Sequence, residues 1–294
     1  MTLKKILGLT TTLAAAALLA ACAPSSGKED KASDKGEKLT VGVMAFDDTT
    51  EPLWDEISAL AKKEGVTLDF VQFTDYTQPN TALDNGEVDV NAFQHYDFLN
   101  NWNKENDGDL VAAADTLLSP IHLFSGAEGG KAKYKEVSEL PEGAVIAVPN
   151  NATNESRALY VLESAGIIDL EVPKGEIATL DSIVKNSKNV TIKEVAADQL
   201  AANLVSVDAA IINNAFAQSA GIDYKTSLYK EEVNEGSKQW VNIIAAQKDW
   251  EKSDKADAIK KLISVYQTDE IAKVLNETSK GIDIPAWEGA PTFN

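Results

Sequence analysis

Apolar and polar side chains along the chain follow two periods, one typical of strands and one typical of helices. Residues 39–44 alternate and predict a strand, whereas residues 52–63 place Leu53, Ile57 and Leu60 on one stripe and predict a helix. Further strands are predicted at 66–73, 88–92, 110–114, 119–125, 144–148, 190–195, 207–212 and 240–246. Further helices are predicted at 80–83, 97–105, 153–165, 197–204, 213–220, 255–266 and 269–277, and a turn or hairpin loop at 126–130. This alternation favours mostly parallel sheets covered by helices.

The alternation runs through two units, which predicts an α/β fold with two lobes. The strand at 119–125 would carry the chain out of the first unit, and the strand at 240–246 would bring it back. We therefore assign 38–120 and 246–294 to a first lobe and 121–245 to a second lobe. Two hinge crossings between the lobes suit a cleft that closes on a small solute.

The first residues of the chain carry a different signal. Lys4 and Lys5 precede an apolar run at 6–21 that is too short for a permanent membrane span. Cys22, the only cysteine of the chain, directly follows a Leu-Ala-Ala sequence. This ending resembles the lipobox of bacterial lipoproteins, in which the cysteine thiol is alkylated with diacylglycerol before cleavage on its N-terminal side. An ordinary signal peptide with an incidental cysteine is the alternative.

We predict a lipoprotein signal peptide at 1–21, lipidation at Cys22 and a flexible tether over 22–37. Residues 23–37 have no large apolar side chain and cannot bury enough surface to offset their ordering entropy. Two acyl chains anchor a protein stably. The mature chain would therefore sit on the extracytoplasmic face of the cell membrane without spanning it.

The chain is strongly acidic. Its formal net charge is -19, and loss of Lys4 and Lys5 with the signal peptide would make it -21. Such a chain does not hold nucleic acid through its phosphates, which excludes nucleic acid as a partner.

Residues for metal binding or nucleophilic catalysis are scarce. The chain has 2 histidines, His95 and His122, and its cysteine is assigned to the lipid. The Asp-x-Asp-x-Asp-Gly, Gly-x-Ser-x-Gly and His-Glu-x-x-His motifs are absent from the sequence. The sequence therefore favours a binding protein over an enzyme and predicts no metal and no cofactor.

Arg157 is the only arginine among the 27 basic residues. It lies in the first turns of a predicted helix that follows a predicted strand, which is where the clefts of α/β sheets open. A guanidinium stays charged when desolvated and can hold a carboxylate through parallel hydrogen bonds. A surface arginine left by chance is the alternative, but its position indicates a site for a carboxylate.

Five blocks of residues stand in order along the chain. They are Phe73-Thr74-Asp75-Tyr76 with Pro79-Asn80, Ala92-Phe93-Gln94-His95, Pro149-Asn150 with Thr153-Asn154-Glu155 and Arg157, Ala210-Ile211-Ile212-Asn213, and Ile284-Pro285-Ala286-Trp287. These blocks resemble the methionine-binding lipoproteins of the NLPA family, the substrate-binding subunits of methionine ABC importers. The resemblance implies a type II periplasmic-binding-protein fold that encloses free methionine between its lobes, performs no catalysis and delivers the ligand to an ABC transporter permease.

The resemblance also implies the ligand-binding residues, which are Tyr76, Phe93, His95, Phe98, Asn154, Arg157 and Asn213. The arginine would hold the ligand carboxylate, the two asparagines would bond its polar end, and the aromatic residues with the histidine would wall its side chain. Phe98 stands where the family has a tyrosine, so the ring is kept and a hydroxyl is lost. A thioether against an aromatic ring contributes about 0.3 to 1.5 kcal/mol per contact, which fits such a wall.

Other interpretations stay open at this point. Phe93 and Phe98 could be core residues, His95 a structural histidine and Asn213 a helix N-cap. Departures from the family pattern at Phe98 and Asn151 leave room for another small amino acid or a methionine-containing dipeptide as the ligand. A surface lipoprotein that binds a protein partner is a further alternative. The main expectation is a monomer that binds methionine and meets a permease.

Overall fold

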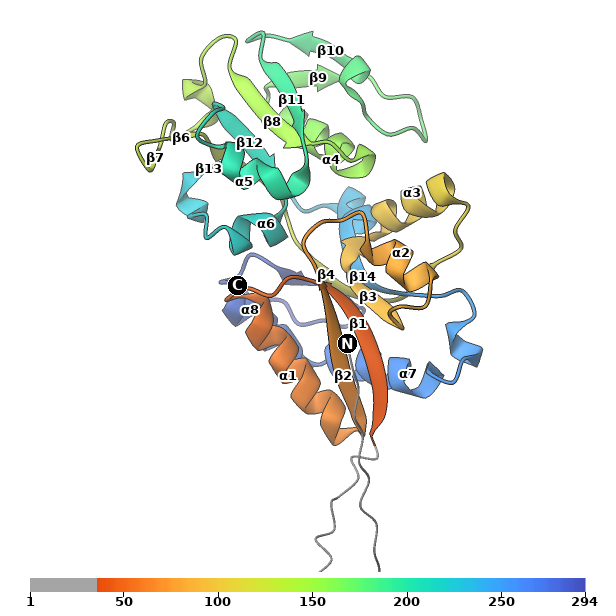
Figure 1. Ribbon diagram of the computed structural model, residues 1–294. Coiled ribbons are helices and arrows are strands. Elements are labelled where there is room, and N and C mark those ends of the chain that lie inside the picture. The colour runs from red at the N-terminus through yellow and green to blue at the C-terminus, as the bar shows by residue number, and fades with distance from the viewer. Residues whose placement is uncertain (1–35, 294) are drawn as a thin grey trace, which may run out of the picture. The chain divides into compact units, whose positions relative to one another are not determined.

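The computed structural model describes residues 36–293, which form one compact unit. The predicted signal peptide at 1–21, Cys22 and all but the end of the predicted tether lie outside the described residues. Glu37, which the sequence assigned to the tether, already belongs to the first strand. The described chain is an α/β fold with two main sheets, each with its own helices (Figure 1). Within residues 36–293, no helix has the length and hydrophobicity needed to cross a membrane.

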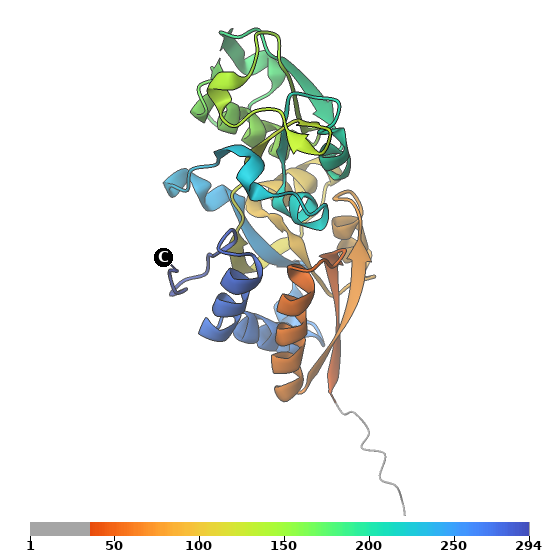
Figure 2. The ribbon, with the colours of Figure 1, turned by 90° about the vertical axis from the view of Figure 1, so that its left-hand side faces the viewer.

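The first lobe is built on a 6-stranded sheet with the strand order β15-β4-β14-β3-β1-β2. Its strands are β1 (Glu37–Met44), β2 (Val66–Phe73), β3 (Val90–His95), β4 (Val111–Leu118), β14 (Val241–Ala246) and β15 (Ile284–Pro285). Its helices are α1 (Thr50–Lys63), α2 (Pro79–Asp84), α3 (Tyr96–Asn106), α7 (Ala256–Tyr266) and α8 (Asp269–Thr278), with the 3-10 helix η6 (Trp250–Lys252). Helix α1 packs against α8 (Figures 1 and 2).

The strand directions correct the expectation of mostly parallel sheets. Strand β1 runs parallel to β2 and β3, but β14 runs antiparallel to both of its neighbours, β3 and β4. Strand β14 comes from far along the sequence and fills the position between β3 and β4. The sheet is mixed because a strand that returns from another lobe is not part of a βαβ unit, which is what enforces parallel pairing.

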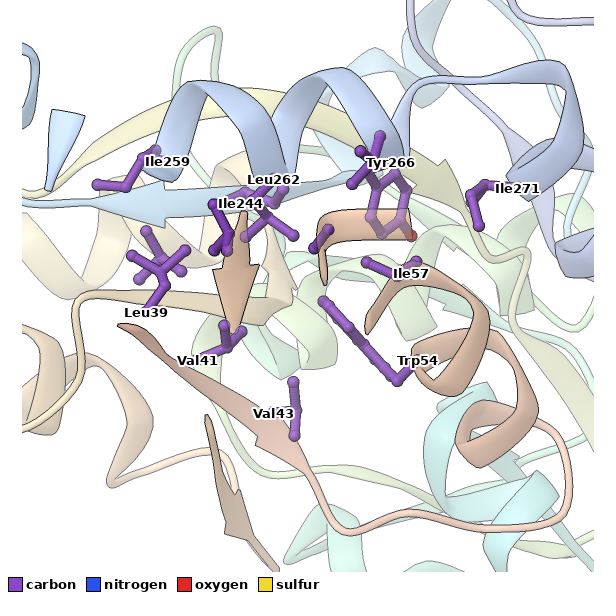
Figure 3. Close-up of a cluster of buried hydrophobic side chains, with 14 of the residues drawn as sticks. Leu39, Val41, Val43, Trp54, Ile57, Ile244, Ile259, Leu262, Tyr266 and Ile271 are labelled. Atoms are coloured by element: carbon purple, nitrogen blue, oxygen red, sulfur yellow. The ribbon is translucent and has the colours of Figure 1, made fainter. Parts of the chain in front are cut away.

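The core of the first lobe lies on both faces of this sheet. Ile244 and Ala246 of β14 pack into the cluster with α1, α7 and α8, whereas Ile243 and Ala245 pack into the cluster with α2 and α3. Successive side chains of a strand point to opposite faces, so a strand that is apolar at every position is buried on both sides. Figure 3 shows Ile244 among the side chains of the first of these clusters.

The second lobe is built on a 5-stranded sheet with the strand order β11-β8-β12-β5-β13. Its strands are β5 (His122–Ser125), β8 (Val145–Pro149), β11 (Thr191–Val195), β12 (Ala209–Ile212) and β13 (Ser227–Lys230). Its helices are α4 (Ala152–Ser164), α5 (Leu200–Asn203) and α6 (Asn214–Ser219), with the 3-10 helices η1 (Val137–Glu139), η2 (Leu180–Ser182), η3 (Ala197–Gln199) and η4 (Tyr224–Thr226). Alternate residues of β12 again face opposite clusters, Ile211 with α4 and Ile212 with α5 and α6.

Two small antiparallel sheets complete the second lobe. Strand β6 (Ala127–Glu128) pairs with β7 (Lys131–Ala132), and β9 (Ile168–Leu170) pairs with β10 (Ile183–Asn186). The first pair confirms the hairpin predicted at 126–130. Strands β9, β10 and β13 were not predicted because they are short and carry no clear apolar alternation.

Two crossings connect the lobes. Residues 119–121 join β4 to β5, and residues 231–240, which include the 3-10 helix η5 (Glu235–Trp240), join β13 to β14. The predicted return strand is confirmed as β14, but all of β14 lies in the first sheet, so the predicted boundary between 245 and 246 is too late. The crossings are bonded to each other, since Glu231 N donates to Ile121 O at 3.0 Å and Ile121 N donates to Glu231 Oε2 at 3.1 Å.

Replacing Ile244 tests how far the first lobe depends on β14. Ile244 is fully buried, so Ile244→Ala leaves a cavity and should lower the free energy of unfolding by about 2 to 5 kcal/mol. Val184→Ala is the control, because Val184 is 60% exposed and its replacement should change that free energy by less than about 0.5 kcal/mol. Urea unfolding followed by circular dichroism measures both. Equal effects would contradict a core role for β14.

Candidate ligand-binding site

A cavity of about 150 Å³ is lined by residues of both lobes. One water needs about 10 to 15 Å³, so the cavity has room for a solute of roughly ten to fifteen non-hydrogen atoms. All the residues predicted to bind the ligand line this cavity, namely Tyr76, Phe93, His95, Phe98, Asn154, Arg157 and Asn213. The structure therefore brings them together, while their contacts with a ligand stay a prediction.

The polar residues of the cavity lie where strands end and helices begin. His95 ends β3 and is the N-cap of α3, where its Nδ1 accepts from Phe98 N at 3.1 Å. Asn154 and Arg157 lie in the first turns of α4, which follows β8. Asn213 stands at the N-cap position of α6, directly after β12, but its side chain makes no cap hydrogen bond. The alternative that Asn213 serves only as a helix cap is therefore not supported.

Aromatic rings form one wall of the cavity. The ring centroids of Phe93 and Phe98 lie 5.6 Å apart, and the centroid of Tyr76 lies 5.9 Å from that of Phe93 and 6.1 Å from that of Phe98. The ring centroid of Phe216 of α6, a residue that was not predicted, lies 4.8 Å from that of Tyr76, although Phe216 does not itself line the cavity. The first three rings are only partly buried, so the interpretation of Phe93 and Phe98 as ordinary core residues is not supported.

Arg157 is buried, with 3% of its side chain exposed, and it is already paired. Its Nε donates to Glu231 Oε1 at 2.8 Å, and its Nη2 donates to Glu231 Oε2 at 2.5 Å. The same Nη2 donates to Ser119 O at 3.0 Å, and the guanidinium carbon lies 5.1 Å from the centre of the Trp240 ring. The carboxylate of Glu231 thus already makes the pair of parallel hydrogen bonds to the guanidinium that was expected of a ligand carboxylate.

The donors of Arg157 that stay available are those on Nη1. The N–H groups of Nε and Nη2 are all used in the bonds to Glu231 and Ser119. Nη1 makes no hydrogen bond to any residue between 36 and 293, and Arg157 lines the cavity. A carboxylate in the cavity can therefore meet Arg157 through one nitrogen, rather than through the two-nitrogen edge.

His95, Asn154 and Asn213 form a hydrogen-bonded chain across the cleft. Because Phe98 N–H donates to His95 Nδ1, the ring proton of neutral His95 is on Nε2. Nε2 then donates to Asn154 Oδ1 at 3.3 Å, and Asn213 Nδ2 donates to the same oxygen at 2.8 Å. His95 comes from the first sheet and the asparagines from the second lobe, so this chain links the two lobes.

Asn213 Oδ1 is an unpaired acceptor in the cavity. It is buried and has no hydrogen-bond partner among residues 36–293. A buried acceptor without a donor costs about 1 to 3 kcal/mol. A solute or a water that donates to this oxygen removes the cost, and an ammonium group is such a donor.

Positive charge is scarce in the cavity. Burial, with a smaller contribution from the charge of Arg157, lowers the pKa of His95 from 6.5 to about 3, so the ring is neutral at physiological pH. Asp283 also lines the cavity, and burial raises the pKa of its carboxyl group, which accepts from Ser119 Oγ. Arg157 is therefore the only basic residue with a positive charge among the described residues that line the cavity.

His122 lies away from this cavity. Its Nδ1 is 2.9 Å from Ser227 Oγ, and its ring stacks on Phe124. In the described part of the chain, no group of at least 3 histidine, cysteine, aspartate or glutamate side chains is arranged to hold a metal ion.

Comparison with known proteins identifies the family of the chain. The model of the NlpA lipoprotein family matches residues 39–287. The chain belongs to the NlpA lipoprotein family. A relative of this NlpA lipoprotein, the probable D-methionine-binding lipoprotein MetQ of Pasteurella multocida, is 35% identical to it over 98% of this chain and 100% of the relative. The family resemblance predicted from the five blocks is confirmed.

Solved structures of similar chains share the two-lobed fold of this NlpA lipoprotein. The substrate-binding protein of a methionine transporter from Streptococcus pneumoniae is 55% identical, with a TM-score of 0.82 over 85% of this chain and 96% of that one. A nutrient-binding protein from Burkholderia cenocepacia, solved bound to methionine, is 34% identical, with a TM-score of 0.76 over 85% and 100% of the two chains. The predicted fold class is confirmed.

Three residues that shape the site of this NlpA lipoprotein were not predicted. Glu231 is one of 46 acidic residues, and no motif marks it as the partner of Arg157. Trp240 and Phe216 contact the site through Arg157 and Tyr76 respectively. The available signal was position, because Trp240 begins the predicted return strand and Phe216 lies on the predicted helix that begins at Asn213.

The buried His95 should make stability depend on pH in a defined window. Below pH 6.5 the unfolded chain binds a proton at His95 that the folded chain does not bind until about pH 3. The free energy of unfolding therefore falls as pH decreases through this window. His95→Asn keeps an acceptor for the N-cap of α3 but cannot titrate, so its loss of stability between these pH values should be smaller. Urea unfolding at several pH values gives the free energy of unfolding of both proteins. Subtracting one pH profile from the other removes the contribution of the other titrating groups, which both proteins share. Identical pH slopes for both proteins would contradict the burial of His95.

Proposed function

We propose that this NlpA lipoprotein is an extracytoplasmic, lipid-anchored binding protein that captures methionine and delivers it to an ABC import permease. It acts as a monomer and performs no catalysis. The observation that carries this function is a single cavity in which a free guanidinium nitrogen and a free amide oxygen stand with a wall of aromatic rings. A methionine zwitterion has a carboxylate, an ammonium and a thioether, which match these features one by one.

In the proposed complex the carboxylate accepts from Arg157 Nη1, and the ammonium donates to Asn213 Oδ1. Asn154 Oδ1 already accepts two hydrogen bonds, so Asn154 contributes its remaining amide N–H to the carboxylate end. The thioether lies against Phe93 and Phe98, where a sulfur contact with a ring contributes about 0.3 to 1.5 kcal/mol. His95 has no free polar atom after its two hydrogen bonds and offers only its ring face.

The names and titles of the relatives support the ligand and the setting. Relatives are named as D-methionine-binding lipoproteins, and similar structures come from a methionine transporter and from a complex with methionine. Anchoring through Cys22 on the outer face of the cell membrane rests on the lipobox, because Cys22 lies outside the described residues. Contact with a permease rests on the transporter context of the relative from Streptococcus pneumoniae.

The size of the cavity fits free methionine but does not by itself exclude the alternative of a methionine-containing dipeptide. A volume of about 150 Å³ accommodates roughly ten to fifteen non-hydrogen atoms. Methionine is within this limit, and the smallest methionine-containing dipeptide falls within it too. Calorimetric competition between methionine, other small amino acids and methionine-containing dipeptides decides the case, and a stronger competitor than methionine would replace it as the ligand.

Methionine binding should depend on Arg157. Isothermal titration calorimetry on a chain that begins at Gly36, unfolded and refolded to remove retained ligand, should detect methionine binding. Arg157→Ala removes a charge-assisted hydrogen bond and should weaken binding by about tenfold to a hundredfold. Lys260→Ala, which removes an exposed positive charge on α7, should leave affinity unchanged. Failure of the refolded protein to bind methionine would refute the proposed function.

The aromatic wall should select the thioether. Norleucine has a methylene group in place of the methionine sulfur, so the ratio of the two affinities isolates the contact between sulfur and ring. Phe93→Leu keeps an apolar side chain but removes a ring, and it should reduce the preference for methionine by about twofold to tenfold. Phe293→Leu, which removes a ring that is 38% exposed and does not line the cavity, is the matched control. An unchanged preference in Phe93→Leu would show that sulfur does not contact this ring.

A further inference from the structure

The pairing of Arg157 with Glu231 changes the charge that a ligand meets. Arg157 is the only positively charged basic residue among the described residues lining the cavity. The carboxylate of Glu231 neutralises this charge from outside the cavity. Glu231 itself does not line the cavity, and 11% of its side chain is exposed. A ligand that enters therefore finds a guanidinium that already has a carboxylate partner.

Glu231 is held firmly in this role. Its Oε1 accepts from Arg157 Nε, and its Oε2 accepts from both Arg157 Nη2 and Ile121 N. Its own backbone N–H donates to Ile121 O at 3.0 Å. Both carboxylate oxygens and the backbone of Glu231 are thus fixed to the first crossing and to α4, and Glu231 has little freedom to move away when a ligand arrives.

We propose that Glu231 is a specificity-determining residue, which makes the site accept α-amino acids as zwitterions and reject carboxylates that lack an ammonium group. Glu231 acts through Arg157 and does not touch the ligand. This inference rests on the proposed function, because it assumes that the ligand carboxylate meets Arg157. It adds the reason why a ligand that has a carboxylate but no ammonium group is not bound tightly.

The physical reason is the balance of buried charge. A ligand carboxylate at Nη1 puts a second negative charge on a guanidinium that Glu231 already neutralises. Uncompensated charge in a desolvated site costs several kcal/mol, unless another positive charge accompanies it. The ammonium of an amino acid enters with the carboxylate and supplies that charge.

The protein offers no substitute for the ligand ammonium. His95 is neutral, and the other ionisable side chains that line the cavity, Asp283, Tyr76 and Tyr266, add no positive charge. Asp283 is linked to the site through Ser119, whose Oγ donates to the Asp283 carboxyl group while its carbonyl oxygen accepts from Arg157 Nη2. Without Glu231, by contrast, Arg157 would carry a full uncompensated charge and would attract any carboxylate of suitable size.

The test compares methionine with its 2-hydroxy analogue, in which a hydroxyl group replaces the ammonium and keeps a hydrogen-bond donor for Asn213. Calorimetry with the full-length protein gives the ratio of the two affinities. The wild type should prefer methionine strongly. Glu231→Gln keeps the shape and an acceptor oxygen but removes the charge, so the preference should fall by about tenfold or more, with tighter binding of the hydroxy acid.

Glu232→Gln is the matched control, because it removes the same charge from the adjacent, exposed residue and should keep the wild-type preference. A preference in Glu231→Gln equal to that of the control would overturn the proposal. If the wild type binds methionine and the hydroxy acid equally, this inference fails while the proposed function stands. If the wild type binds neither ligand, the proposed function fails as well.

Glu231→Asp covers the case in which Glu231→Gln does not fold. It keeps the negative charge on a shorter side chain, so Tm should fall while the preference for methionine is retained. Loss of the preference in Glu231→Asp would mean that the shape of residue 231, rather than its charge, controls selectivity, and would overturn the proposal.

Discussion

The structure depends on one buried ion pair at the junction of its two lobes. Arg157 of α4 and Glu231 of the second crossing lie 2.5 Å apart at their closest atoms, and both also bond the first crossing, at Ser119 and Ile121. Removing one partner of such a pair costs about 3 to 5 kcal/mol, because the other charge stays buried without compensation. The same contact therefore orients the guanidinium, joins the crossings and sets the charge of the cavity.

The other polar residues of the site lie near the ends of strands. The polar groups of the cavity come from the last residue of β3, from the helix that follows β8 and from the residue that follows β12. His95, Asn154 and Asn213 then meet in one chain of hydrogen bonds that starts in the first lobe and ends in the second. Neither lobe alone contains all the partners, so the polar end of the site is complete only where the two lobes meet.

Much of this architecture could be predicted from the sequence, and the failures have common causes. The periods of helices such as α1 and α7 are strong, and the seven ligand-binding residues that the family resemblance implies all line the cavity. The direction of β14 and the partner of Arg157 could not be predicted, because both depend on segments far apart in sequence. Glu231 is 74 residues from Arg157, and nothing in its neighbours distinguishes it from other acids. A contact between residues this far apart produces no pattern in the local sequence around either of them.

The position of β14 also has a consequence for the order in which the protein folds. During synthesis from the N-terminus, β3 and β4 are complete long before the segment that separates them, so the nascent first sheet has a gap in its middle. The five strands of the second sheet, by contrast, lie in one continuous stretch from β5 to β13. That stretch can form its own core while unpaired edges of β3 and β4 stay exposed to other chains. The newly made protein is thus most prone to aggregation in the interval before residues 241–246 emerge.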